Sequence, residues 1–125
     1  MPKVSPLAPA GGFPSIPPVP GVRFATASAA VRYRDRTDVM LAVLAPGTTV
    51  AGVFTKSATR ASPVLDCETK LGPDRMGGAS RAGAAILVNS GNANAFTGAR
   101  GALSVAEISA ATAQATGVPE TRVFT

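Results

Sequence analysis

The residues of this sequence that could do chemistry are concentrated in one short stretch, residues 89–98. It reads NSGNANAFTG, with three carboxamides, two hydroxyls and glycines at positions 91 and 98. An Asn side chain offers both an acceptor and a donor, so such a loop can hold a polar ligand or another backbone without net charge. The stretch follows an apolar strand and precedes a helix, a position that favours an anionic group or an oxyanion. Turns and helix caps also require Asn and Gly, so a purely structural role stays open.

The chain contains no His and one Cys, Cys67, and this restricts the chemistry further. An internal Ser-His-Asp or Cys-His pair is excluded. Zinc sites built from His and Cys and a disulfide framework are excluded for the same reason, so we expect neither a metal nor a resident cofactor. Cys67 is interpreted as a small buried apolar residue rather than a nucleophile, because no neighbour in the sequence would depress its thiol pKa.

The net charge of +5 raises the question of an anionic partner. The one tight basic group is Arg32, Arg34 and Arg36, around Tyr33 and Asp35. Their alternation would place three guanidinium groups on one face of a strand. A solvated face is the favoured interpretation, with phosphate binding or an acidic partner as alternatives. A small basic binding module for nucleic acid or an acidic protein is therefore the alternative function, although a single aromatic gives no base-stacking platform.

The elements that must position these residues fit one domain of 125 residues, 46% of them hydrophobic. Prolines make residues 1–20 an extended arm, and residues 21–125 form the domain. Strands are predicted over 22–33, 39–45 and 49–55, as an antiparallel meander. A helix follows over 63–71, with Ser62 as its N-cap and Gly72-Pro73 as its stop. We interpret residues 75–81 as a loop and residues 84–88 as a strand.

A longer helix is predicted over 98–116, with Thr97 as a cap and Gly117 after its end. Its buried stripe is predicted to be Leu103, Ala106, Ala110 and Ala113. Residues 122–125 begin a further strand. The fold class is α/β, an α+β layered sandwich with a mixed sheet, and we expect it to be incomplete on its own, with strands that pair with segments outside these 125 residues.

Hydrophobic runs are too short for a membrane helix, which needs about 20 apolar residues, and the start lacks an export signal, so we expect a cytoplasmic protein. A catalytic N-terminal amine on Pro2, exposed by removal of Met1, is a further but weaker alternative.

Two strings, residues 51–56 (AGVFTK) and 86–98 (ILVNSGNANAFTG), resemble the N-terminal part of the glutamate N-acetyltransferase family, also called ornithine acetyltransferase. Supporting pieces are VSPLAP at 4–9, GVR at 21–23, RTD at 36–38 and ASPV at 61–64. The resemblance runs through essentially all of the chain in order and spacing.

This resemblance implies an enzyme of arginine biosynthesis that moves an acetyl group from N-acetylornithine to glutamate, with acetyl-CoA as a donor in some members. The family precursor cleaves itself before a Thr, which becomes the N-terminal nucleophile of a β chain. Its own α-amine can serve as the base, so no His is required. The implied partner of this chain is that β chain, in αβ units that associate into α2β2, with a mixed-sheet sandwich covered by helices.

The resemblance places no family catalytic residue within residues 1–125. The oxyanion Thr-Gly is expected just after Thr125 and the nucleophile further on, so this chain alone is expected to be inactive. We expect the loop to border the substrate cavity and to brace the oxyanion strand. Its candidate site residues are Asn89, Ser90, Gly91, Asn92 and Asn94.

Overall fold

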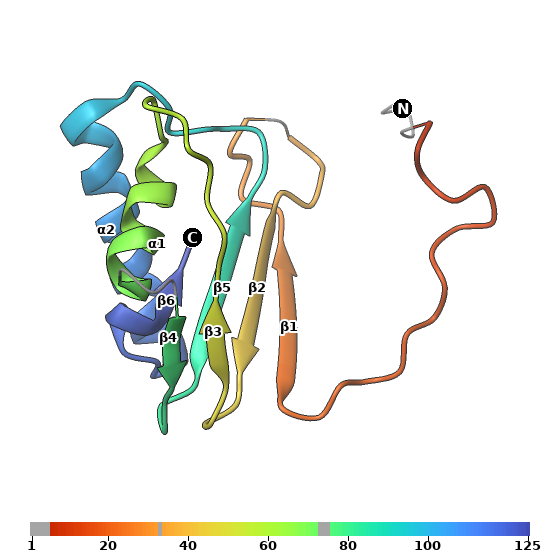
Figure 1. Cartoon of the computed structure of the whole chain (residues 1–125). Helices are drawn as coiled ribbons and strands as arrows, with labels where there is room; N and C mark the ends of the chain where they lie inside the picture. The colour runs from red at the N-terminus through yellow and green to blue at the C-terminus, as the bar shows by residue number, and fades with distance from the viewer. Residues whose placement is uncertain (1–5, 33, 73–75) are drawn as a thin grey trace.

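A mixed four-stranded sheet is the centre of the fold in the computed structural model, which describes residues 6–32, 34–72 and 76–125. Its strands are β1 (Val22–Ala27), β2 (Val39–Leu44), β5 (Ala84–Asn89) and β6 (Val123–Phe124), in the order β1-β2-β5-β6. The pairs β1/β2 and β2/β5 are antiparallel, and β5/β6 is parallel. Helices α1 (Ser62–Leu71) and α2 (Gly98–Thr116) lie side by side at the β6 end of the sheet (Figure 1). The α+β class and the mixed sheet are confirmed.

The parallel pair β5/β6 decides where the polar loop lies. Ala85 is opposite Val123 and Ile86 is opposite Phe124. The carboxyl ends of parallel neighbours meet at the same edge of a sheet. The loop of residues 89–98, called the asparagine loop below, therefore starts at the edge toward which β6 runs (Figure 1).

The predicted meander is wrong, because the third strand leaves the main sheet. Strand β3 (Thr49–Ala51) is shorter than predicted and pairs with β4 (Met76–Ala79) in a separate two-stranded sheet. The predicted loop over 75–81 is thus wrong for residues 76–79; position 75 lies outside the described residues. Two glycines gave β4 a low strand propensity, and only its pairing with a distant strand makes it extended.

The buried guanidinium of Arg122 joins this small sheet to the rest of the fold. Its Nη2 donates to the Thr48 carbonyl over 2.8 Å, its Nη1 to Gly78 over 3.1 Å and its Nε to Gly83 over 3.0 Å. Only 7% of Arg122 is exposed. The planar fork of an Arg can serve several carbonyls at once, so one side chain fixes β3, β4 and the turn before β5 relative to β6.

The predicted strand over 22–33 is wrong for residues 28–32, since β1 ends at Ala27; position 33 lies outside the described residues. The carboxylate of Asp38 accepts the backbone N–H groups of Ala29 and Val31, each over 2.7 Å. Ala30 between them has a φ of 52°. These N–H groups turn toward one carboxylate, as in a side-chain-stabilised turn, and are thereby diverted from a strand ladder.

Helix α1 begins one residue earlier than predicted, with Ala61 at the N-cap position and Ser62 as the first helical residue. No side chain caps it. The Ser62 N–H instead donates to the Asn94 carbonyl over 3.1 Å. The predicted stop is confirmed at Gly72, whose N–H bonds to the Glu68 carbonyl; Pro73 lies outside the described residues.

Helix α2 has the predicted bounds, but its predicted buried stripe is wrong. Leu103 is 64% exposed, Ala106 and Ala110 are exposed, and Ala113 is half-buried. The face that packs inward consists of small residues and one valine: Gly101, Val105, Ser109 and Thr112. Buried hydroxyls occupy positions that a hydrophobicity pattern assigns to solvent.

Two apolar clusters form the core. Leu71, Ala84 and Phe124 make one, and Ala85, Val118 and Val123 the other. Residues 6–20 extend away from the β1 end of the sheet (Figure 1) and expose Phe13 and Ile16. Within the described part of the chain, neither helix is long and apolar enough to cross a membrane.

Candidate functional site

Backbone hydrogen bonds at both ends fix the asparagine loop. At its start, the Ser90 N–H donates to the Asp38 carbonyl over 2.8 Å. Further along, the Asn94 carbonyl accepts from the Ser62 N–H and, over 3.2 Å, from the Thr97 hydroxyl. The loop is therefore hydrogen-bonded both to the residue before β2 and to the beginning of α1.

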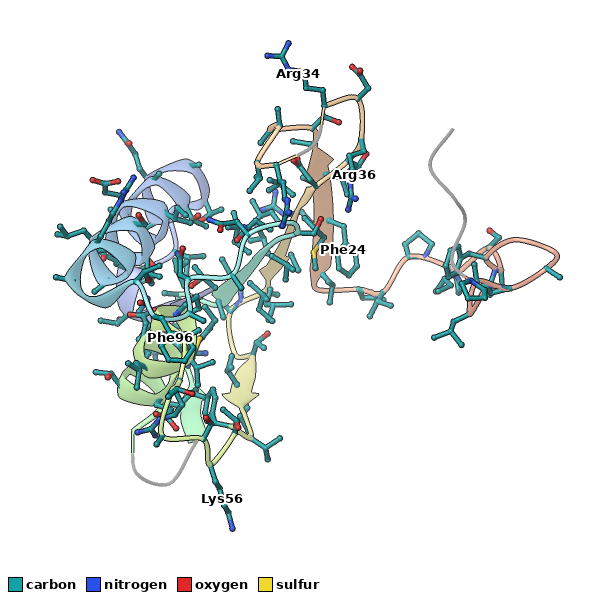
Figure 2. The ribbon with its side chains drawn as sticks, turned by 90° about the horizontal axis from the view of Figure 1, so that it is seen from above. Phe24, Arg34, Arg36, Lys56 and Phe96 are labelled. Atoms are coloured by element: carbon teal, nitrogen blue, oxygen red, sulfur yellow. The ribbon has the colours of Figure 1, made fainter. Side chains whose placement is uncertain are left out.

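Thr97 holds the N-cap position of α2, but its hydroxyl does not cap the helix as predicted, since it donates back to the loop. Positive φ angles occur at Gly91 (103°) and Gly98 (54°), as their type allows. Phe96 also has a positive φ, 58°, which is strained for a bulky residue. Its ring is 85% exposed and lies beside α1 (Figure 2).

The three carboxamides gather at one hollow. Asn89, Asn92 and Asn94 line a cavity of about 440 Å³ between the sheet and α2, together with Ser104. The Asn89 Nδ2 lies 3.5 Å from the Asn92 carbonyl oxygen. Asn89 and Asn94 are half-buried, whereas Asn92 is exposed. The loop thus offers amide donors and acceptors to a polar group in this cavity.

A second cavity, of about 620 Å³, lies on the other side of the loop, between α1 and α2. Asn94 lines it as well, with Phe96, Thr97 and residues of both helices. Asn94 is therefore the one candidate residue of the loop that borders both hollows.

The predicted strand face of three arginines is wrong. Arg32, Arg34 and Arg36 lie in the connection between β1 and β2, and Tyr33 lies outside the described residues. Arg34 points away from the fold, whereas Arg36 turns back along the connection (Figure 2). The Arg36 Nη2 donates to the Ser90 Oγ over 3.0 Å. The geometric premise of a basic binding face is lost, and Arg36 joins the asparagine loop instead.

Asp38 is a site residue that sequence reasoning missed. It is 4% exposed. Its carboxylate accepts two N–H groups of the connection between β1 and β2, and its backbone carbonyl accepts the Ser90 N–H. The hydrogen bond from the Ala29 N–H, the largest cause, and that from Val31 lower the pKa of this carboxyl below its usual 3.8, against the opposing effect of burial. Asp38 therefore stays ionised and anchors the edge of the site.

Cys67 agrees with its predicted structural role, although it is half-buried rather than buried. Burial raises the pKa of its thiol above the usual 9.0. The Sγ donates to the Thr125 carbonyl over 3.5 Å. A thiol with a raised pKa is a poor nucleophile at neutral pH.

A mixed sheet whose parallel strands end beside a polar loop and a helix start is typical of α/β proteins that bind ligands at the carboxyl ends of strands. The model of the ArgJ family matches residues 23–125. The chain therefore belongs to the ArgJ family.

Relatives of high identity carry the same name. The chain is 65% identical over 123 residues to the arginine biosynthesis bifunctional protein ArgJ of Ruegeria pomeroyi, covering 98% of this chain and 29% of that protein. It is 51% identical over 121 residues to ArgJ of Bradyrhizobium diazoefficiens, covering 97% of this chain and 27% of that protein. The chain spans less than a third of the length of these curated relatives.

Two solved structures share the fold. The crystal structure of ArgJ from Bacillus halodurans matches with a TM-score of 0.71 and 28% identity, over 84% of this chain and 51% of that one. The ornithine acetyltransferase of Mycobacterium tuberculosis, complexed with ornithine, matches with a TM-score of 0.66 and 32% identity, over 84% of this chain and 54% of that one.

Proposed function

We propose that this chain is the N-terminal part of an acetyltransferase that moves an acetyl group from N-acetylornithine to glutamate in arginine biosynthesis. Membership of the ArgJ family supports this role. So does the fold shared with a protein named ornithine acetyltransferase, solved with ornithine. Acetyl-CoA is proposed as an additional acetyl donor, and the working protein as a cytoplasmic enzyme.

One observation carries the proposal. The asparagine loop leaves the sheet at the carboxyl end of β5, and the parallel neighbour β6, which pairs with Ala85 and Ile86, runs toward the same edge. Residues that follow Thr125 would enter a space beside the carboxamides of this loop. An oxyanion Thr-Gly string at that place would meet the polar surroundings that a developing negative charge requires.

The proposed chemistry proceeds in two transfers. The hydroxyl of the Thr that begins a β chain attacks the acetyl carbonyl of N-acetylornithine, the amide C–N bond breaks, and ornithine leaves with the proton. The amine of glutamate then attacks the acetyl-Thr ester, the C–O bond breaks, and the Thr hydroxyl is restored. The free α-amine of the same Thr moves the protons, so no His is needed.

Residues 1–125 supply the frame of this site rather than its nucleophile. We propose that they act with a β chain from the same precursor, in αβ units that associate into α2β2, and that they are inactive alone. The asparagine loop borders the substrate cavity. It also braces the oxyanion strand indirectly, through α1. The loop accepts the first N–H of α1, and side chains of α1 bond the carbonyls of Val123 and Thr125.

Intact mass spectrometry tests the proposal on a polypeptide of the relatives' full length that carries these 125 residues, called the full-length protein below. We expect two chains, the second beginning with Thr, and one added acetyl group on that chain after incubation with N-acetylornithine. A single uncleaved chain that gains no acetyl group would refute the proposed mechanism.

A further inference from the structure

We propose that Lys70 is a positioning residue of the acetyl-transfer site, which holds the end of strand β6 in the place that the reaction requires. This inference rests on the proposed function. Its physical basis is a set of contacts that joins α1, α2 and β6 at one partly buried ammonium group.

The Lys70 Nζ contacts three oxygen atoms, one on each of three elements. It lies 2.7 Å from the Asp66 Oδ2 on α1, donates to the Ser109 Oγ on α2 over 3.1 Å, and donates to the Val123 carbonyl on β6 over 2.8 Å. Its side chain is 11% exposed, and Ser109 is 1% exposed. The ammonium thus donates two hydrogen bonds, to Ser109 and Val123, and forms an ion pair with the Asp66 carboxylate.

The contact with Val123 is part of a regular pattern. The Cys67 Sγ, one helical turn before Lys70, donates to the carbonyl of Thr125. Residues 123 and 125 are two apart, and alternate residues of a strand direct their carbonyls to the same side. Two side chains of α1 therefore bond the carbonyls of Val123 in β6 and of Thr125, the residue after it, in the manner of a neighbouring strand.

This pattern gives β6 a second set of contacts. Among the described residues, its strand neighbour is β5, and the two α1 side chains bond its carbonyl groups from elsewhere. Covering an edge with a helix is one way in which proteins satisfy and protect it. The charge-assisted bond from Lys70 is the stronger of the two α1 contacts, since hydrogen bonds from charged donors are about twice as strong as neutral ones.

The functional consequence follows from where β6 leads. The strand runs toward the edge of the sheet that carries the asparagine loop, so a shift of Val123 displaces the residues after Thr125 relative to that loop. A displacement of about 1 Å at a reacting centre can lower a rate by about 100-fold. Substrate affinity depends on other contacts, so the loss should fall on kcat rather than on KM.

The test uses the full-length protein with the double substitution Lys70→Met and Asp66→Asn. Methionine keeps the length of the lysine stem, and the second change avoids leaving a lone carboxylate, since a broken buried pair is strongly destabilising. The controls are Asp66→Asn alone and Lys56→Met, a lysine that points into solvent (Figure 2). Activity is expressed per mole of acetyl-enzyme formed, so that misfolded or uncleaved protein does not count.

We expect kcat of the double variant to fall by about tenfold or more, with KM within about twofold of the wild type. Hydrogen exchange of the peptide that contains residues 123–125 should become at least about tenfold faster. Lys56→Met should match the wild type in each measurement. Asp66→Asn alone should lose less kcat and gain less exchange than the double variant, because its Lys70 still bonds Ser109 and Val123.

An unchanged kcat per acetyl-enzyme, or unchanged exchange at residues 123–125, would overturn the inference. A loss confined to thermal stability would overturn it also, because Lys70 would then be structural only. If the wild-type protein transfers no acetyl group, the proposed function fails, and the exchange measurement still decides whether Lys70 holds β6.

Discussion

The Arg36 guanidinium donates a hydrogen bond to the Ser90 hydroxyl across 54 residues of sequence. This contact joins the connection between β1 and β2 to the asparagine loop, and Asp38 secures the same junction through the Ser90 N–H. One of the basic residues of the chain, Arg36, is therefore part of the candidate site.

Substituting Arg36 by Ala should loosen the asparagine loop with little effect on global stability. The contact is exposed, so the free energy of unfolding should change by less than about 0.5 kcal/mol. We expect kcat of the full-length protein to fall by about threefold or more, because we propose that the loop borders the substrate cavity. Arg34→Ala is the matched control, since Arg34 points away from the fold (Figure 2). Equal kcat values for the two variants would contradict a role for Arg36.

The carboxamides of Asn92 and Asn94 should matter more for turnover than for folding. The bonds that Asn94 makes to Ser62 and Thr97 use its backbone carbonyl, which Asn94→Ala retains. Each Ala variant should therefore lower kcat by about tenfold while the melting temperature stays within a few degrees. A loss of stability with unchanged turnover would assign these residues a purely structural role.

Gly101→Ala should destabilise the fold, although alanine is the better helix former. A Cβ at this position would overlap the hydroxyl oxygens of Thr97 and Ser62, where α2 crosses the start of α1. We expect a loss of about 1–3 kcal/mol in urea unfolding of the full-length protein, as for other overpacked sites. Helix propensity alone would give a gain of about 1 kcal/mol, so a stabilised variant would show that the two helices do not approach as described.

Asp38 should make the stability of the fold depend on pH in the acid range. Its pKa is lowered in the folded state, so its contribution is fully present above the usual 3.8 and is lost as the pH falls through the folded value. Asp38→Asn cannot accept both N–H groups in the same way, so its urea midpoint should lie below that of the wild type at pH 7. The gap should narrow as the pH falls below about 4. A gap that is constant with pH would contradict the lowered pKa.

The sequence predicts the elements that are determined by local signals. Helix α2 has the predicted bounds because it begins at Gly98, directly after Thr97, and Gly117, with a φ of 73°, ends it. Its inward face was predicted wrongly, because the partners of Ser109 and Thr112 are set by packing and not by hydrophobicity. Strand β4 was missed because two glycines make it extended only when it pairs with β3.

The same division holds for the candidate site. The place of the asparagine loop, between a strand and a helix, is local and was predicted. The contacts of Lys70 join residues 39 and 53 positions apart, and no pattern in one sequence indicates such partners. An acid just before a strand indicates the Asp38 turn only once β1 is known to stop at Ala27.

Transfer of an isotopically labelled acetyl group tests the central claim most directly. The full-length protein is incubated with N-acetylornithine, labelled in its acetyl group, and unlabelled glutamate, and the products are followed by NMR. The proposed function predicts labelled N-acetylglutamate and free ornithine in equal amounts, with no added cofactor. Labelled acetate without N-acetylglutamate, or an unchanged N-acetylornithine signal, would contradict it.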